Sequence, residues 1–258
     1  MNIQPQHARL MRLATFAALA AALTLALAKA IAWWLSGSVS LLAGLTDSLL
    51  DGAASLLNLI AVHYALRPAD EDHRYGHGKG EALAALVQAG LVFASALFVG
   101  WEAVQRIFDP RPVTSGTWSV AVVLISMALT GWLVWMQGRA MRKSGSMAVA
   151  ADRAHYAGDL AANGVVLIGV ISGTFLAAPG LDAAAGLIVA VWLFWGALGV
   201  LKAAADHLVD KAVPDADRIA ITTAVLADPR ISGVHQLRTR MAGASMMIQM
   251  HIDLDPAL

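Results

Sequence analysis

The sequence contains no cysteine, so it forms no disulfide and offers no thiolate to a metal. It is also poor in charge: 14% of its 258 residues are charged, and acidic and basic side chains cancel to a net charge of zero. This balance gives no basic surface for nucleic acid and no acidic tail. The sequence is instead rich in apolar residues: 58% are hydrophobic, and the mean hydropathy of +0.64 is well above that of a soluble domain. Any metal would have to be held by His, Asp and Glu.

Long apolar stretches predict an α-helical membrane protein. A helix that crosses the hydrocarbon core of a bilayer needs about 20 mostly apolar residues. Six stretches meet this need, and we expect six transmembrane helices at 13–35, 39–66, 81–107, 117–138, 147–175 and 182–204. The N-terminus shows no convincing small-residue cleavage site, so we interpret the first stretch as a span and not as a signal peptide.

The basic residues of the short connections predict the orientation of the chain. Cytoplasmic connections carry an excess of Lys and Arg. One side holds only Arg106 and Arg111, near the sequence FDPRPVTSG. The other side holds Arg9, Arg12, Arg67, Arg74, Lys79, Arg139, Arg142, Lys143, Lys202 and Lys211. We therefore expect a multi-pass protein with both termini in the cytoplasm.

The character of the sequence changes after about residue 210. A stretch that reads as an amphipathic helix, DKAVPDADRIAITTAVLADPR, precedes two segments separated by a glycine-containing turn, the second of which alternates as a strand does. The sequence thus predicts a transmembrane domain over 1–209 and a small cytoplasmic α/β domain over 210–258. One helix and two strands make a thin core, so we expect this domain to be partial, truncated where more structure would follow.

Two of the expected spans carry ionisable pairs with a spacing of four residues. Asp47 and Asp51 lie in the second span, and His155 and Asp159 lie in the fifth. Residues i and i+4 share one face of a helix. A charge at the centre of a bilayer costs about 2.5–3.5 kcal/mol on the insertion scale, so three carboxylates need compensation. A divalent cation is the simplest compensation, and three Asp oxygens with one His nitrogen suit tetrahedral Zn²⁺. The alternative is a buried hydrogen-bond network that fixes helix packing.

Such a site also indicates what could drive the movement of metal across the membrane. Metal binding requires ionised Asp and neutral His, so metal and protons compete for the same atoms. A site that alternates between two faces of the membrane would carry metal one way and protons the other. His155 is the best proton carrier of the set, because the ordinary pKa of imidazole lies near physiological pH.

Three other features have both a functional and a structural interpretation. Asp70, His73 and His77 lie in the loop RPADEDHRYGHGKGEAL with spacings compatible with a second metal site, although acid- and His-rich loops are often only solvated. His235 and His251 lie on the two expected strands, where they could bind metal or be ordinary surface residues. Lys29 is an unexplained charge inside the first span, which could lie against the acidic site or extend to an interface.

With these residues in view, the chain resembles the cation diffusion facilitator family. It is most similar to the YiiP-like branch, which exports ferrous iron, zinc and cadmium from bacteria. The resemblance runs from the first span to the end of the chain. The segments that carry it are WWLSGSVSLLAGLTDSLLDGAASLLNL, PADEDHRYGHGKGEALAAL, HYAGDLAANG and GVHQLRTR.

The resemblance implies a homodimer in the bacterial inner membrane, with six spans per protomer, that exports divalent metal in exchange for protons. The family's transport site is matched by Asp47, Asp51, His155 and Asp159. Its first position is Asp here where zinc-selective relatives often have His, so Cd²⁺ and Fe²⁺ stay open beside Zn²⁺.

Further family features are matched outside the membrane site. Asp70, His73 and His77 match the loop site of this branch, and Lys79 and Asp210 match a charge interlock that holds the dimer. His235 and His251 match part of a dinuclear site in a metallochaperone-like cytoplasmic domain. In the family a further helix and strand supply the remaining ligands, so the dinuclear site is expected to be incomplete here.

Two other function classes use the same residues. An intramembrane metalloenzyme would activate water on the metal, but four protein ligands close the shell and no H-E-x-x-H is present. A metal-gated cation channel would conduct without proton movement, but one tight mid-membrane site does not suit a pore with weak multiple sites. The sequence thus favours a proton-coupled antiporter for divalent transition metals, with membrane lipid around it.

Overall fold

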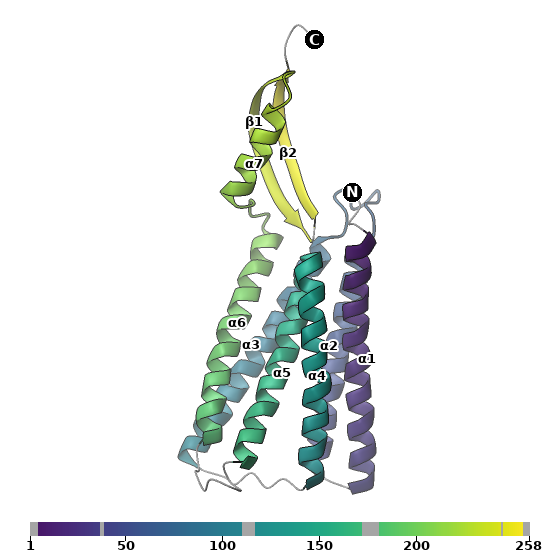
Figure 1. The fold of residues 1–258 in the computed structure, drawn as a ribbon, viewed down its shortest axis with the longest axis vertical. Coiled ribbons are helices and arrows are strands. Elements are labelled where there is room, and N and C mark those ends of the chain that lie inside the picture. Colours follow the sequence, from purple (N-terminus) through teal and green to yellow (C-terminus); the bar gives the residue numbers. More distant parts are fainter. Residues whose placement is uncertain (1–4, 37–38, 110–116, 172–180, 244, 255–258) are drawn as a thin grey trace.

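The computed structural model describes residues 5–36, 39–109, 117–171, 181–243 and 245–254. Six long helices lie side by side in one bundle, and a helix with two strands stands on one end of it (Figure 1). The elements are α1 Pro5–Ser36, α2 Val39–Ala65, α3 Lys79–Phe108, α4 Thr117–Ser144, α5 Met147–Ile171, α6 Leu181–Leu208, α7 Asp215–Leu226, β1 Ile231–Ala242 and β2 Ser245–Leu254.

The six helices fall where the apolar stretches predict them. In the described residues, four helices are long and apolar enough to cross a membrane: Pro5–Leu35, Gly44–Ala65, Lys79–Phe108 and Ala183–Leu208. The other two, α4 and α5, carry more polar residues but pack within the same bundle, each against the other. The mostly helical membrane fold is confirmed, whereas the count of six spans stays a prediction. The last four residues of the fifth expected span, 172–175, lie outside the described residues.

Small side chains fill the contacts between helices. Ala18 and Ala21 of α1 are buried with Leu133 of α4 and Tyr156 of α5. Alanines on one face of α3 are likewise buried, which lets the helix axes approach closely, as is typical of membrane bundles. Large apolar side chains point outward instead, among them Phe16, Phe98, Ile188 and Trp195, each more than half exposed. This inversion of a soluble protein's pattern fits a surface surrounded by lipid.

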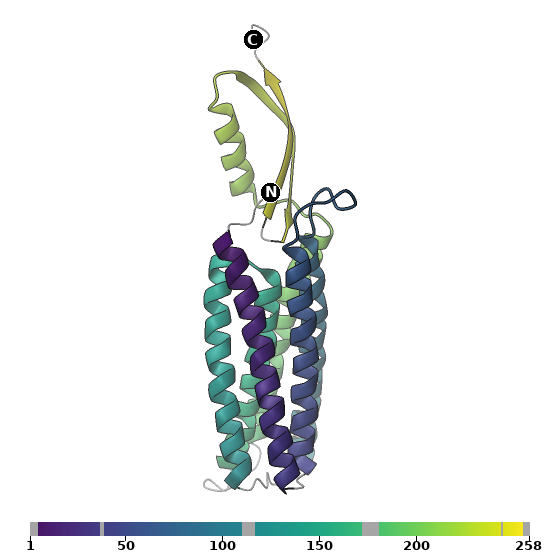
Figure 2. The same ribbon diagram turned by 90° about the vertical axis from the view of Figure 1, so that its right-hand side faces the viewer.

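The predicted cytoplasmic domain consists of α7 packed on an antiparallel hairpin. The hairpin turns after Ala242, which pairs with Ser245, and Gly243 has a φ of +61° in the turn. The sheet is interrupted between His235 and Arg238, where Gln236 has a φ of +52° and the register shifts. Both described ends of the chain lie at the hairpin end of the bundle (Figure 2).

Candidate metal centres

The first candidate centre lies inside the bundle, between α2 and α5. The ligand atoms of Asp51, His155 and Asp159 all lie within 4.8 Å of one another. His155 Nε2 is 3.1 Å from Asp51 Oδ1 and 3.7 Å from Asp159 Oδ2. The side chain of His155 is 10% exposed and that of Asp51 is 16% exposed. Two carboxylates therefore meet one imidazole in a mostly buried place, which is an arrangement that a cation can occupy.

Tyr156 lies beside this centre and contacts α1 and α2. Its hydroxyl lies 2.6 Å from Ser55 Oγ of α2 and donates to the backbone oxygen of Ala18 in α1, at 3.2 Å. Its ring packs against the imidazole of His155, with 5.5 Å between the ring centroids. The contacts tie α1, α2 and α5 together next to the centre, and they restrict how the His155 ring can turn.

Asp47 does not join the other three expected ligands in this structure. It lies one turn before Asp51 on α2 and is exposed. Four residues along an α-helix is a rotation of about 400°, so the two carboxylates differ by about 40° around the axis. Asp51 faces α5 and Asp47 lies toward the edge of that face. Three of the four predicted transport-site residues are brought together here.

The second candidate centre lies in the loop between α2 and α3. The ligand atoms of Asp70, His73 and His77 lie within 4.8 Å of one another. Asp70 Oδ1 accepts the backbone N–H of His73 at 2.6 Å, and Asp70 Oδ2 is 3.3 Å from His77 Nε2. The hydrogen bond from the His73 backbone holds the pKa of the Asp70 carboxyl below its usual range. Asp70 is therefore ionised at neutral pH, as a metal ligand must be.

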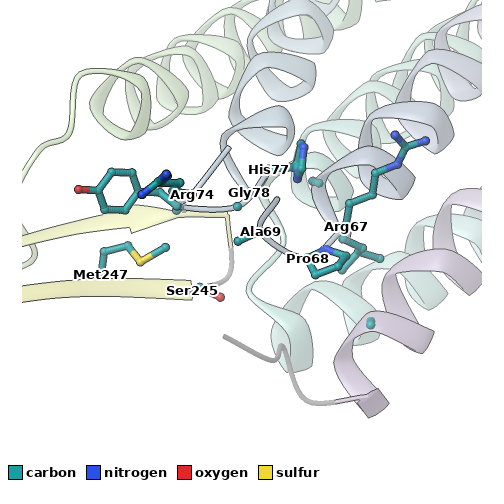
Figure 3. Close-up of a pocket in the computed structure, with 14 residues that line it drawn as sticks. Arg67, Pro68, Ala69, Arg74, His77, Gly78, Ser245 and Met247 are labelled. Atoms are coloured by element: carbon teal, nitrogen blue, oxygen red, sulfur yellow. The ribbon is translucent and has the colours of Figure 1, made fainter. Parts of the chain in front are cut away.

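His77 is the buried member of the loop centre. Its side chain is 3% exposed, its ring lies edge-on to Tyr64, and its Nδ1 atom has no hydrogen-bond partner among the described residues. It also lines a cavity of about 400 Å³ between the loop and the hairpin, in which Ser245 and Met247 lie on one side and Arg67 and Pro68 on the other (Figure 3). The loop centre thus lies where the bundle meets the cytoplasmic domain.

The two histidines of the hairpin lie directly opposite each other. His235 of β1 and His251 of β2 are partners in the register, and both are exposed. His235 Nε2 is 2.7 Å from Asp253 Oδ2, an acidic neighbour that the sequence analysis did not single out. Within the described chain, clusters of three close ligating side chains occur at the first two centres and not at this one.

The residues matched to a charge interlock also meet. Lys79 Nζ is 3.0 Å from Asp210 Oδ1, and Arg240 Nη1 is 3.1 Å from Asp210 Oδ2. The hydrogen bond from Lys79 lowers the pKa of the Asp210 carboxyl. Asp210 thus links the start of α3 to β1 within one chain.

A buried polar cluster beside the first centre was not predicted from the sequence. Asp152 of α5, which is 1% exposed, accepts hydrogen bonds from Gln88 Nε2 and Gln137 Nε2, each at 2.7 Å. Asp152 lies three residues before His155, so it shares the face of α5 that carries His155 and Asp159. Gln88 is an isolated polar residue in the apolar stretch ALAALVQAGLVF, which is the signal that could have indicated it. Gln137 lies next to the basic end of α4 and carries no such signal.

Both parts of the chain match known protein families. Residues 15–209 match the family described as cation efflux transmembrane domain, and residues 213–258 match the family described as cation efflux protein, cytoplasmic domain. The chain is similar to the cation-efflux pump FieF of Serratia proteamaculans strain 568, with 41% identity over 256 residues, which is 99% of this chain and 85% of that protein. It is also similar to the cation-efflux pump FieF of Klebsiella pneumoniae, with 42% identity over 252 residues, 98% of this chain and 84% of that protein.

Proposed function

The chain belongs to the cation efflux, or cation diffusion facilitator, family of membrane transporters, and from this premise we propose that it exchanges a cytoplasmic transition metal for protons at one intramembrane site. It is a multi-pass membrane protein that moves divalent metal cations, and it is a transporter and not an enzyme. The proposed transport site is formed by Asp47, Asp51, His155 and Asp159. The metal we propose is Zn²⁺, with Cd²⁺ and Fe²⁺ as alternatives.

The observation that carries this proposal is the meeting of Asp51, His155 and Asp159 within the bundle. Four ligands of this kind suit tetrahedral Zn²⁺, since imidazole supplies the nitrogen and carboxylates supply the oxygens. Asp47, one turn along α2, would complete the shell by a small rotation of α2 or of its own side chain. A rotation of this kind is also a way to open the site, because it removes one ligand.

Proton exchange follows from the chemistry of these ligands. Without metal, Asp51 and Asp159 face one imidazole, and a proton on His155 Nε2 can be shared with Asp51 at 3.1 Å. An arriving metal ion needs that nitrogen lone pair and displaces the proton. A proton that enters from the other side of the membrane would in turn help to release the metal.

The remaining features complete the proposal. We place the six helices across the bacterial inner membrane with both termini in the cytoplasm, assign 1–209 to the transmembrane domain and 210–258 to the cytoplasmic domain, and expect a homodimer. The loop centre of Asp70, His73 and His77 would hold a second metal ion at the cytoplasmic surface. His235 and His251 would hold metal in the cytoplasmic domain, with Asp253 as a neighbouring acceptor.

A zinc titration of the purified full chain tests the transport site. Asp51→Ala should remove one binding phase completely, because it takes away the carboxylate that contacts His155 from α2. The matched control is Asp215→Ala, which removes an exposed carboxylate paired with Arg218 on α7. A titration of Asp51→Ala that is identical to that of the parent would contradict the site.

A further inference from the structure

Lys29 is a charged residue in an apolar helix. The transport site itself does not explain the role of this lysine. Between Arg12 and Ser36 it is the one charged residue of the sequence. Its Nζ atom donates to Ser48 Oγ of α2 at 2.7 Å, and Ser48 is 1% exposed. The side chain is therefore directed across to α2, instead of extending along its own helix to a membrane surface as a lysine near a helix end does.

The chain makes room for this lysine at Gly44. A Cβ atom built on Gly44 would lie 3.6 Å from Lys29 Cδ and 3.8 Å from Lys29 Nζ. The aliphatic part of the lysine thus lies along the glycine, one turn before the serine that holds the ammonium group. Gly44 and Ser48 form a shallow seat on α2 into which Lys29 fits. The helices α1 and α2 pack against each other and come together toward the end away from the hairpin (Figure 2).

The seat brings the ammonium group next to the transport site. Ser48 follows Asp47 directly and precedes Asp51 by three residues. Because Ser48 accepts the hydrogen bond from Lys29, the ammonium group lies beside the turn of α2 that carries Asp47 and Asp51. Lys29 also lies on the side of the site away from the hairpin, because α1 begins at the hairpin end and Lys29 is in its last third (Figure 1).

Lys29 offsets one negative charge of the four proposed ligands, and the neighbouring Asp152, held by Gln88 and Gln137, is not counted among them. Three ionised Asp side chains and a neutral His carry a charge of −3, and Lys29 reduces it to −2, which is the complement of one divalent cation. A site with a net charge of −3 would bind a divalent ion more tightly than a site with a net charge of −2. A transporter must release its cargo as well as bind it. A fixed positive charge beside the ligands weakens binding without occupying a coordination position.

We propose that Lys29 is the built-in counter-ion of the transport site, which lowers the affinity for the metal and speeds its release on the side away from the hairpin. Lys29 is a positioning charge and not a ligand. The inference rests on the proposed function, since it needs a metal at Asp51, His155 and Asp159. The competing explanation is structural: the hydrogen bond to Ser48 ties α1 to α2 and has no effect on metal.

Two neutral variants separate charge from hydrogen bonding. Lys29→Met removes both, whereas Lys29→Gln keeps a donor for Ser48 and removes only the charge. In a zinc titration at one fixed pH, the binding phase that Asp51→Ala removes should tighten about tenfold in both variants. In proteoliposomes the maximal rate of zinc transport should fall, because release becomes slower. The matched control is Lys202→Met, which removes one exposed positive charge on α6 and should change neither value.

The outcomes distinguish this inference from the function on which it rests. If Asp51→Ala removes the binding phase while both Lys29 variants bind and transport as the parent does, Lys29 is not a counter-ion and the transport site stands. If Lys29→Met weakens binding and Lys29→Gln restores it, the lysine is a structural tie and the inference is wrong. If Asp51→Ala binds zinc as the parent does, the transport site fails and the role of Lys29 fails with it.

Discussion

At the scale of single residues, the proposed transport site depends on which faces of α2 and α5 meet. The spacing of His155 and Asp159 predicts that they share a face, and the structure confirms it with 3.7 Å between His155 Nε2 and Asp159 Oδ2. The spacing could not say which of Asp47 and Asp51 would meet them, because that depends on the rotation of one helix against another. The side chains that hold the site in place, Ser55 and Tyr156, depend on the same rotation.

Gln88 belongs to a part of the interior that was not predicted at all. It donates to Asp152 from α3, and Gln137 donates to the same carboxylate from α4, so three helices meet at one buried charge. A lone Gln within an apolar stretch carries little information until its partner is known. Periodicity therefore predicts each helix and not this contact between helices.

Gln88→Leu should lower the stability of the bundle. It leaves Asp152 Oδ1 without its donor in a fully buried place, which costs about 1–3 kcal/mol, more if the carboxylate stays ionised. Thermal unfolding of the full chain in detergent measures the loss. Gln105→Leu, at an exposed position of the same helix, is the control. Equal melting temperatures for Gln88→Leu and the parent would show that the hydrogen bond to Asp152 contributes nothing.

At the scale of elements, the helices and strands begin and end close to where the sequence predicts them. The clearest differences are α1, which begins at Pro5 and not at the expected residue 13, and α4, which continues to Ser144, beyond the expected end at residue 138. The last turn of α4 carries Arg142 and Lys143, and basic side chains are favourable at the negative end of a helix dipole. Hydropathy marks the apolar part of a helix and does not register a polar extension into water.

The first turn of α5 is held by a residue of another helix. Glu81 of α3 is 1% exposed, and its Oε2 atom accepts from Ser146 Oγ at 2.6 Å and from the backbone N–H of Met147 at 3.1 Å. A carboxylate at a helix N-terminus satisfies free N–H groups and favours the helix dipole. Glu81 was not predicted to have this role, because a cap supplied from another helix leaves no local pattern in the sequence.

Glu81→Gln should therefore loosen the start of α5. The neutral amide keeps the shape but weakens the hydrogen bonds from Ser146 and Met147, so the amides of residues 147–151 should exchange with solvent several-fold faster. Hydrogen exchange followed by mass spectrometry measures this. Glu102→Gln removes an exposed carboxylate of the same helix, 3.3 Å from Arg106, and should leave these amides unchanged. Identical protection of α5 in Glu81→Gln and the parent would contradict the cap.

At the scale of the whole molecule, one carboxylate joins the bundle to the cytoplasmic domain. Asp210 has a φ of +58° just after α6, a conformation that Asp and Asn tolerate better than most residues. From this position it reaches both Lys79 at the start of α3 and Arg240 on β1. Lys79 also donates to the backbone oxygen of Leu208, at 3.2 Å. The resemblance to known transporters indicated the pair of Lys79 and Asp210, and no feature of the sequence indicated Arg240.

Asp210→Asn should loosen this junction while it keeps the backbone conformation. Because the hydrogen bond from Lys79 lowers the pKa of Asp210 in the folded state, the stabilising effect of Asp210 is present above the unfolded pKa of about 3.9. It is lost as the pH falls through the lower folded value. Proteolysis of the 209–214 connection should thus be faster in Asp210→Asn than in the parent at neutral pH, and the two should converge in acid. Asp206→Asn, which removes the nearby pair with Lys211, is the control. A difference that persists in acid would assign the effect to something other than charge.

The central claim is that Asp51, with its partners on α5, couples metal movement to proton movement. The most direct measurement is zinc uptake into inside-out proteoliposomes that contain a pH-sensitive dye, for the parent and for Asp51→Ala. In such vesicles the cytoplasmic face is outside, so export appears as uptake. We predict that zinc enters and protons leave with the parent, and that neither moves with Asp51→Ala although the variant is folded and inserted. Zinc entry without a proton signal, or equal zinc entry in the variant, would contradict the account.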